Sequence, residues 1–164
     1  MKRYILLLFI FYLFGFEIYS QIDKHEVINI ITNYIELNQE FLADPDSDNR
    51  KELEKYAEDK VNPALVEMQK IICNNHDIEL LSKFIEMLLA TKNSADEFPY
   101  YILGKIYCCQ PEITWNILAS TESKTDKKFL MGQLEFVLLY IANECNEKIF
   151  TKLKANIDSL KNEL

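Results

Sequence analysis

Apolar residues recur at spacings of three and four positions along almost the whole chain, and this pattern constrains the fold more than any other feature. Such spacing places side chains on one face of an α-helix. Glycine, which tight hairpin turns between strands often need, occurs only three times among 164 residues. The sequence therefore predicts an all-α fold: an irregular bundle or short solenoid of about seven helices in antiparallel hairpins.

Turn signals divide this pattern into successive helices. The expected helices span approximately residues 23–43, 50–60, 63–73, 77–91, 94–110, 111–119, 127–143 and 147–160. Asn62 is expected to cap the helix that Pro63 begins, and Asp77 to cap the next one. Apolar residues, Phe136 among them, cover much of the circumference of the 127–143 helix. We therefore expect that helix to be central and contacted on several sides.

The stretch from Ser94 to Leu118 is expected to be the packing centre of the domain. Ser94 and Glu97 have the spacing of a capping box, which would start a helix at Ser94. Gln110-Pro111 ends that helix and opens the next, because proline disfavours a helical residue before it but suits a first helical position. The sequence predicts two helices joined at a tight corner.

Aromatic residues cluster in the same stretch, and they allow two interpretations. Core packing is the ordinary role of such rings. Alternatively, some of them line a groove, since aromatic side chains anchor protein interfaces. The candidates for such a binding surface are Tyr100, Tyr101, Tyr107 and Trp115.

The first 20 residues have the pattern of a signal peptide. Lys2 and Arg3 precede an apolar run from Tyr4 to Phe16, which is too short for an ordinary membrane span. We expect cleavage before Gln21, although an uncleaved anchor is the alternative. Residues 21–164 would then form a single all-helical domain, with no stable membrane span after cleavage, in the bacterial periplasm or outside the cell. The C-terminal Lys-Asn-Glu-Leu offers the lumen of the endoplasmic reticulum as an alternative location.

All four cysteines lie after the signal segment, where an oxidising compartment would allow disulfide bonds. Cys108 and Cys109 are adjacent, and on a helix their side chains point about 100° apart, so a bond between them would be strained. The economical arrangement joins each of them to a distant partner, Cys73 or Cys145. The alternative is that all four are small buried apolar residues.

The net charge of the chain limits the classes of partner that it can be expected to bind. The chain carries 26 acidic and 18 basic residues, a formal net charge of −8. Nucleic acids and anionic membrane surfaces would be repelled, and a basic protein partner is favoured.

Two metal-site patterns occur, and both are incomplete. Asp44, Asp46 and Asp48 have the spacing of the first ligands of a calcium loop, but Asn49 stands where that loop needs glycine, and position 55 is lysine. Cys73 and His76 have zinc-ligand spacing without a second suitable pair. We predict neither metal nor cofactor.

Catalytic motifs do not occur in the sequence. His25 and His76 are the only histidines, and no zinc-protease, nucleophile-elbow or phosphate-loop pattern is present. We therefore predict that the chain is not an enzyme.

One segment carries a resemblance to a known family. The run from Tyr101 to Tyr107, then Gln110-Pro111-Glu112, a short helix and a long apolar helix through Gly132, resembles small exported all-helical immunity proteins that protect bacteria from type VI secretion amidase toxins. The resemblance covers residues 77–141. It implies a periplasmic protein that occludes the toxin's active site through an exposed helix or loop, and it assigns no toxin-contacting residue to this chain.

The functional expectation is an exported protein-binding module of the inhibitor or immunity type. The alternatives are a small-ligand-binding or enzymatic envelope protein with an aromatic-lined pocket, and a structural envelope protein without a specific partner.

Overall fold

The computed structural model describes residues 22–45, 47–94 and 96–163, so the predicted signal segment lies outside the described residues. Over these ranges the secondary structure is helical, without strands, which confirms the all-α prediction. The elements are α2 (Lys24–Ala43), α3 (Ser47–Tyr56), η1 (Ala57–Val61), α4 (Asn62–Asn75), α5 (Ile78–Ala90), α6 (Phe98–Cys109), α7 (Pro111–Ala119), α8 (Lys124–Ile141) and α9 (Glu147–Glu163).

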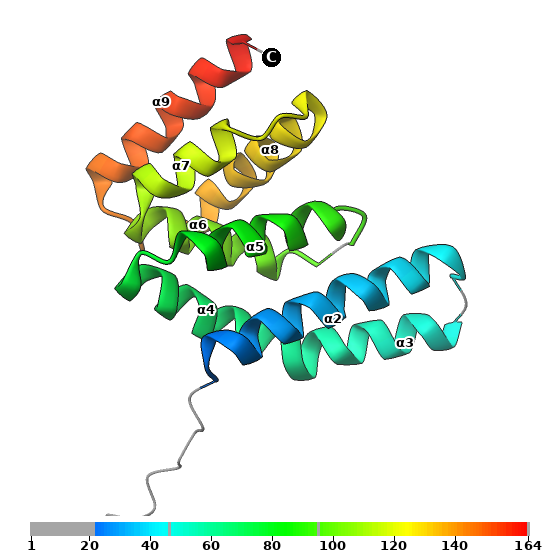
Figure 1. The fold of residues 1–164 in the computed structure, drawn as a ribbon. Coiled ribbons are helices and arrows are strands. Elements are labelled where there is room, and N and C mark those ends of the chain that lie inside the picture. The colour runs from blue at the N-terminus through cyan, green and yellow to red at the C-terminus, as the bar shows by residue number, and fades with distance from the viewer. Residues whose placement is uncertain (1–21, 46, 95, 164) are drawn as a thin grey trace, which may run out of the picture.

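The helices stack as successive hairpins. Figure 1 shows the chain rising from α2 and α3 at one end to α9 at the other. Contacts between the hairpins run from α2 to α5, from α4 to α6 and from α6 to α8. None of the described helices is long and apolar enough to cross a membrane.

Helix α6 lies at the centre of the stack. The 127–143 helix is contacted by several helices, as predicted, but its apolar residues are not all covered. Helix α6 packs against α4, α7 and α8, and its buried residues include Leu103, Ile106 and Tyr107. Helix α8 packs against α6, α7 and α9, but it keeps one exposed face. Gly104 allows α6 and α8 to lie close, because a Cβ at this position would be 3.0 Å from Cγ2 of Val137.

Between α3 and α4 the chain stays helical where the sequence predicted a break. Asn62 was expected to cap a new helix, but it has helical backbone angles, and its N–H donates to the carbonyl of Ala57, five residues earlier. Proline inside an α-helix lacks a donor and clashes with the carbonyl four residues before it. The wider π-turn Ala57–Val61 ends two residues before Pro63, and we attribute it to that proline.

The capping box predicted at Ser94 does not form either. The helix begins at Phe98, and the Oγ of Ser94 accepts a hydrogen bond from the N–H of Asp96. The carboxylate of Asp96 in turn accepts from the N–H of Phe98. The helix start is thus moved four residues along. The predicted corner at Gln110-Pro111 is correct.

Both adjacent cysteines pair with distant partners, as predicted. Cys73 at the end of α4 bonds to Cys109, with the two Cα atoms 5.6 Å apart. Cys108 bonds to Cys145 in the α8–α9 connection, with a Cα–Cα distance of 5.2 Å. The C-terminal end of α6 is therefore tied covalently to segments on both sides of it. Because none of the four cysteines is free, the zinc alternative loses its thiolates.

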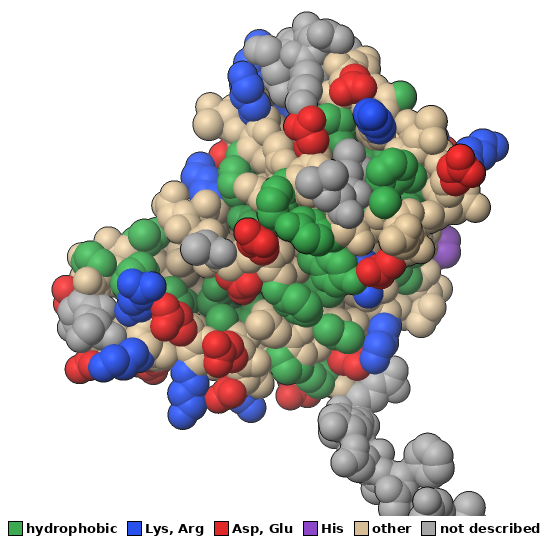
Figure 2. All heavy atoms as spheres, turned by 180° about the vertical axis from the view of Figure 1, so that it is seen from behind, with side chains coloured by type: hydrophobic (Ala, Val, Ile, Leu, Met, Phe, Trp, Pro, Cys, Tyr) green, Lys and Arg blue, Asp and Glu red, His purple; other side chains and the backbone are tan. Residues whose placement is uncertain are grey.

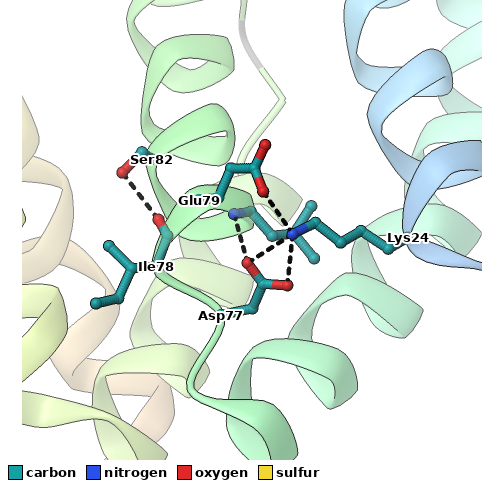
Figure 3. A network of polar contacts seen from close by, with 6 residues as sticks. Lys24, Asp77, Ile78, Glu79 and Ser82 are labelled. Carbon is teal, nitrogen blue, oxygen red and sulfur yellow. Dashed lines mark hydrogen bonds and ion pairs between the residues drawn. The ribbon is translucent and has the colours of Figure 1, made fainter.

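At the turn between α4 and α5, a few residues after Cys73, an ion-pair network ties α2 to α5 (Figure 3). Asp77 accepts a hydrogen bond from the N–H of Leu80, which is the predicted helix cap. The ammonium of Lys24 lies 2.8 Å from a carboxylate oxygen of Asp77 and 2.7 Å from Glu79. Burial alone would raise the pKa of Asp77, but these donors outweigh it and hold the pKa below its usual value.

Candidate functional site on the outer face of α8

Two aromatic side chains stand on the exposed face of α8. Phe136 is 38% exposed and Tyr140 is 56% exposed. They are one helical turn apart, and their ring centroids are 5.4 Å from one another. Burying such rings against a partner removes apolar area from water and adds the favourable energy of aromatic packing. The pair is therefore an aromatic surface of the kind that protein interfaces use as an anchor.

Gly132 lies one turn before Phe136 on the same face. It is exposed, and a Cβ added to it would meet no described atom within 4 Å. Nothing in the described packing requires a glycine here, although glycine within a helix costs about 0.5–1 kcal/mol relative to alanine. A glycine on an open helix face allows another chain to approach the backbone closely.

A hollow of about 340 Å³ adjoins the aromatic pair. From α8 it is lined by Gly132, Gln133 and Phe136, and the opposite wall is formed by residues between Lys92 and Tyr100. Helix α8 lies behind α7 in the view of Figure 1. Figure 2, taken from behind, shows hydrophobic side chains gathered along the middle of this face with charged groups around them. We define the α8 face as Gly132, Phe136, Tyr140 and this hollow.

The wall opposite α8 is acidic. Asp96 and Glu97 both line the hollow. Lys92 also lines it, but its ammonium is 3.0 Å from a carboxylate oxygen of Asp126 in an ion pair. The carboxylates of Asp96 and Glu97 therefore give this wall of the hollow a negative charge.

Tyr100, one of the four predicted surface residues, lines this hollow but belongs mainly to the core. Its side chain is only 5% exposed, and its ring packs edge-on against Phe129 with centroids 5.9 Å apart. Burial, together with the negative charge of Asp96, raises the pKa of Tyr100 to about 12. Its hydroxyl therefore stays protonated at neutral pH.

The other predicted surface residues lie elsewhere. Tyr107 is fully buried, so its assignment to a binding surface is wrong. It was placed there because spacing cannot show which face of a helix stays open. Tyr101 is half-buried, and its hydroxyl donates to Glu144. The ammonium of Lys105 lies 4.9 Å from the Tyr101 ring centroid. Trp115 is half-buried against the core.

The residues of the α8 face were not identified from the sequence. Phe136 was assigned to the apolar circumference of a central helix, and Tyr140 and Gly132 were given no surface role. The available signal was the spacing of 132, 136 and 140, which places all three on one side of a helix. That side is opposite the buried Leu130, Leu134 and Val137.

Among the described residues, no cluster of three or more His, Cys, Asp or Glu side chains could hold a metal ion. The incomplete calcium-loop pattern at residues 44–55 is only partly described. Within it, the side-chain amide of Asn49 donates to the carbonyl of Asp44 at 2.9 Å.

Comparison with protein families, curated proteins and solved structures finds no match to this chain.

Proposed function

We propose that this protein is an exported binding module that recognises a basic protein partner through the α8 face. The observation that carries the proposal is the exposed pair Phe136 and Tyr140, beside an open glycine and an acidic hollow. Interfaces concentrate their binding energy in a few aromatic anchors surrounded by polar groups. The α8 face has both features, because the aromatic pair lies beside the acidic side chains of the hollow.

The net charge of the whole chain supports a partner with positive charge. A net charge of −8 would speed association with a cationic surface and repel acidic ones. Export is supported by the leader-like first 20 residues and by two disulfide bonds, which persist in oxidising compartments. An inhibitor or immunity protein, the class that the segment 77–141 resembles, would act in this way by covering a toxin. We propose binding rather than catalysis.

Tyr140 and Ile78 provide a matched pair for the test, since they are 56% and 55% exposed and lie on different helices, α8 and α5. The partner is first isolated from the envelope fraction at low salt with the wild-type protein and then purified. Its affinity is measured by calorimetry for the wild type, Tyr140→Asp and Ile78→Asp. We expect Tyr140→Asp to weaken binding about tenfold or more, because loss of an aromatic anchor usually costs over 1 kcal/mol.

Ile78→Asp should leave the affinity within about twofold, since it makes the same chemical change away from the α8 face. Raising the salt concentration should weaken the wild-type complex. Equal affinities of both variants would place the interface elsewhere, and salt-independent binding would remove the electrostatic part of the proposal. If the purified partner is an enzyme, its activity in the complex tests the inhibitor function directly.

A further inference from the structure

The two disulfide bonds differ in their access to solvent. In the bond between Cys73 and Cys109, Cys109 is exposed and Cys73 is half-buried. In the other bond, Cys145 is only 9% exposed, and Cys108 is packed against the core. Thiol–disulfide exchange begins when a thiolate reaches one of the two sulfur atoms. An external thiolate therefore reaches Cys73–Cys109 more easily than Cys108–Cys145.

The two sulfur atoms of the accessible bond have different neighbours. The side-chain amide nitrogen of Gln69, one turn earlier on α4, donates toward Sγ of Cys73 at 3.8 Å. Sγ of Cys109 instead lies 3.2 Å from the carbonyl oxygen of Ile106. A nearby N–H favours negative charge on sulfur, and a carbonyl oxygen disfavours it. A thiolate is therefore more stable on Cys73 than on Cys109.

These two differences select the same direction of reaction. The rate of exchange depends on access to the attacked sulfur and on the stability of the thiolate that leaves. Cys109 is the more accessible sulfur, and Cys73 is the better leaving group. We propose that the Cys73–Cys109 bond is a thiol-exchange site, at which a small thiol becomes attached to Cys109.

The step is a substitution at sulfur. The external thiolate forms a bond to Sγ of Cys109, the bond between Cys109 and Cys73 breaks, and its electron pair stays on Sγ of Cys73. The attacking sulfur is oxidised and the Cys73 sulfur is reduced, so the number of disulfide bonds is unchanged. The products are a mixed disulfide on Cys109 and a thiolate on Cys73.

Non-covalent contacts remain where the bond opens. The side chain of Gln110 is buried, and its amide nitrogen donates to the carbonyl of Cys73 at 2.9 Å. Helix α4 also packs against α6. These contacts hold the end of α4 beside α6 when the bond is open, and Cys108–Cys145 still ties α6 to the α8–α9 connection. The proposal does not depend on partner binding by the α8 face.

The test treats the oxidised protein with millimolar reduced glutathione under native conditions. Samples taken over time are quenched with acid, free thiols are alkylated, and peptide fragmentation in a mass spectrometer locates each adduct. At early times we expect glutathione on Cys109 and the alkyl group on Cys73. Adducts on Cys73, Cys108 or Cys145 should form about tenfold more slowly or less often.

A pair of matched variants tests the leaving group. Gln69 and Gln133 are both half-buried, on α4 and α8 respectively. Gln69→Leu removes the donor beside the Cys73 sulfur and should slow the first exchange about threefold or more, because a less stable thiolate leaves more slowly. Gln133→Leu makes the same change away from the bond and should react like the wild type.

The location of the adduct in the wild type tests the proposal even if Gln69→Leu does not fold. Glutathione found mainly on Cys73 would reverse the assigned direction. Opening of both disulfide bonds at the same rate would mean that exchange follows general unfolding. Absence of an adduct at millimolar glutathione would show that the bond is closed to thiols. An unchanged rate in a folded Gln69→Leu would remove Gln69 from the step and overturn the assignment of the leaving group.

Discussion

Asp77 combines two roles in one carboxylate. It caps α5 through the N–H of Leu80 and pairs with Lys24 of α2, while its side chain is only 16% exposed. A cap joins a helix to its own first turn, whereas the ion pair joins that turn to a helix more than 50 residues earlier. This residue therefore contributes both to local helix formation and to the docking of two hairpins.

We predict that Asp77→Ala destabilises the protein by roughly 1 kcal/mol at pH 7 through loss of the cap. The folded-state pKa of Asp77 is below its unfolded value, so the ionised form is the one that stabilises the fold. Its contribution is present above the unfolded pKa near 4 and is lost as the pH falls through the folded pKa. Urea unfolding at pH 7 and pH 3 should show the gap between wild type and variant narrowing at low pH.

Glu79→Gln is the matched control at the same lysine. Glu79 is 78% exposed, and an exposed ion pair contributes little. We expect almost no change in unfolding free energy at either pH. A loss as large as that of Asp77→Ala would show that the ion pairs, rather than the cap, dominate.

At the scale of helices, the two described glycines have opposite surroundings. A Cβ at Gly104 would lie 3.0 Å from Val137 and 3.1 Å from Ile141, whereas a Cβ at Gly132 would meet nothing within 4 Å among the described atoms. Both positions gain helix propensity when alanine replaces glycine. Only at position 104 would the added methyl group force two packed helices apart.

We therefore predict changes of opposite sign for the same substitution. Gly132→Ala should stabilise the protein by about 0.5–1 kcal/mol. Gly104→Ala should destabilise it by about 1–2 kcal/mol, because overpacking between α6 and α8 exceeds the gain in propensity. Chemical denaturation of both variants under the same conditions checks this. Stabilisation by both would mean that α8 moves away without cost.

Helix boundaries show how far the sequence could be used. The cap at Asp77 and the corner at Pro111 were predictable, because each depends on one residue and its immediate neighbours. Ser94 and Asn62 failed as caps because nearby residues provide competing local arrangements. Near Ser94, the Asp96 carboxylate bonds to the Phe98 N–H and starts the helix later. Before Pro63, a π-turn keeps the chain helical.

The candidate sites were harder to predict from the sequence than the fold was. An apolar stripe shows that a helix has hydrophobic residues, but it does not say whether a neighbour covers each of them. From its apolar character Phe136 would be assigned to the core. It is exposed only because α8 lies at an outer position in the fold. The thiol-exchange site depends on which cysteine stays exposed, so the spacing of the cysteines could not predict it.

For the whole molecule, the disulfides constrain how the segments on both sides of α6 are held together. The two bonds close loops between residues 36 and 37 positions apart. Loop-closure entropy for this length corresponds to roughly 3–4 kcal/mol per bond. We predict that the double variant Cys108→Ser, Cys145→Ser loses stability of this order in urea unfolding. The wild type treated with reductant should lose more, since both bonds break. A loss below about 1 kcal/mol would mean that packing alone holds α8 and α9 in place.

Of the two adjacent cysteines, one bonds to a partner earlier in the sequence and the other to a partner later in it. This has a consequence for the integrity of the chain. The loops closed by Cys73–Cys109 and Cys108–Cys145 overlap at the peptide bond between 108 and 109. Every peptide bond from residue 73 to residue 145 is therefore bridged by at least one disulfide. A single proteolytic cut anywhere in this stretch leaves the two fragments in one covalent molecule. A protein released among proteases would in this way survive nicking of any one of its central connections without losing a piece.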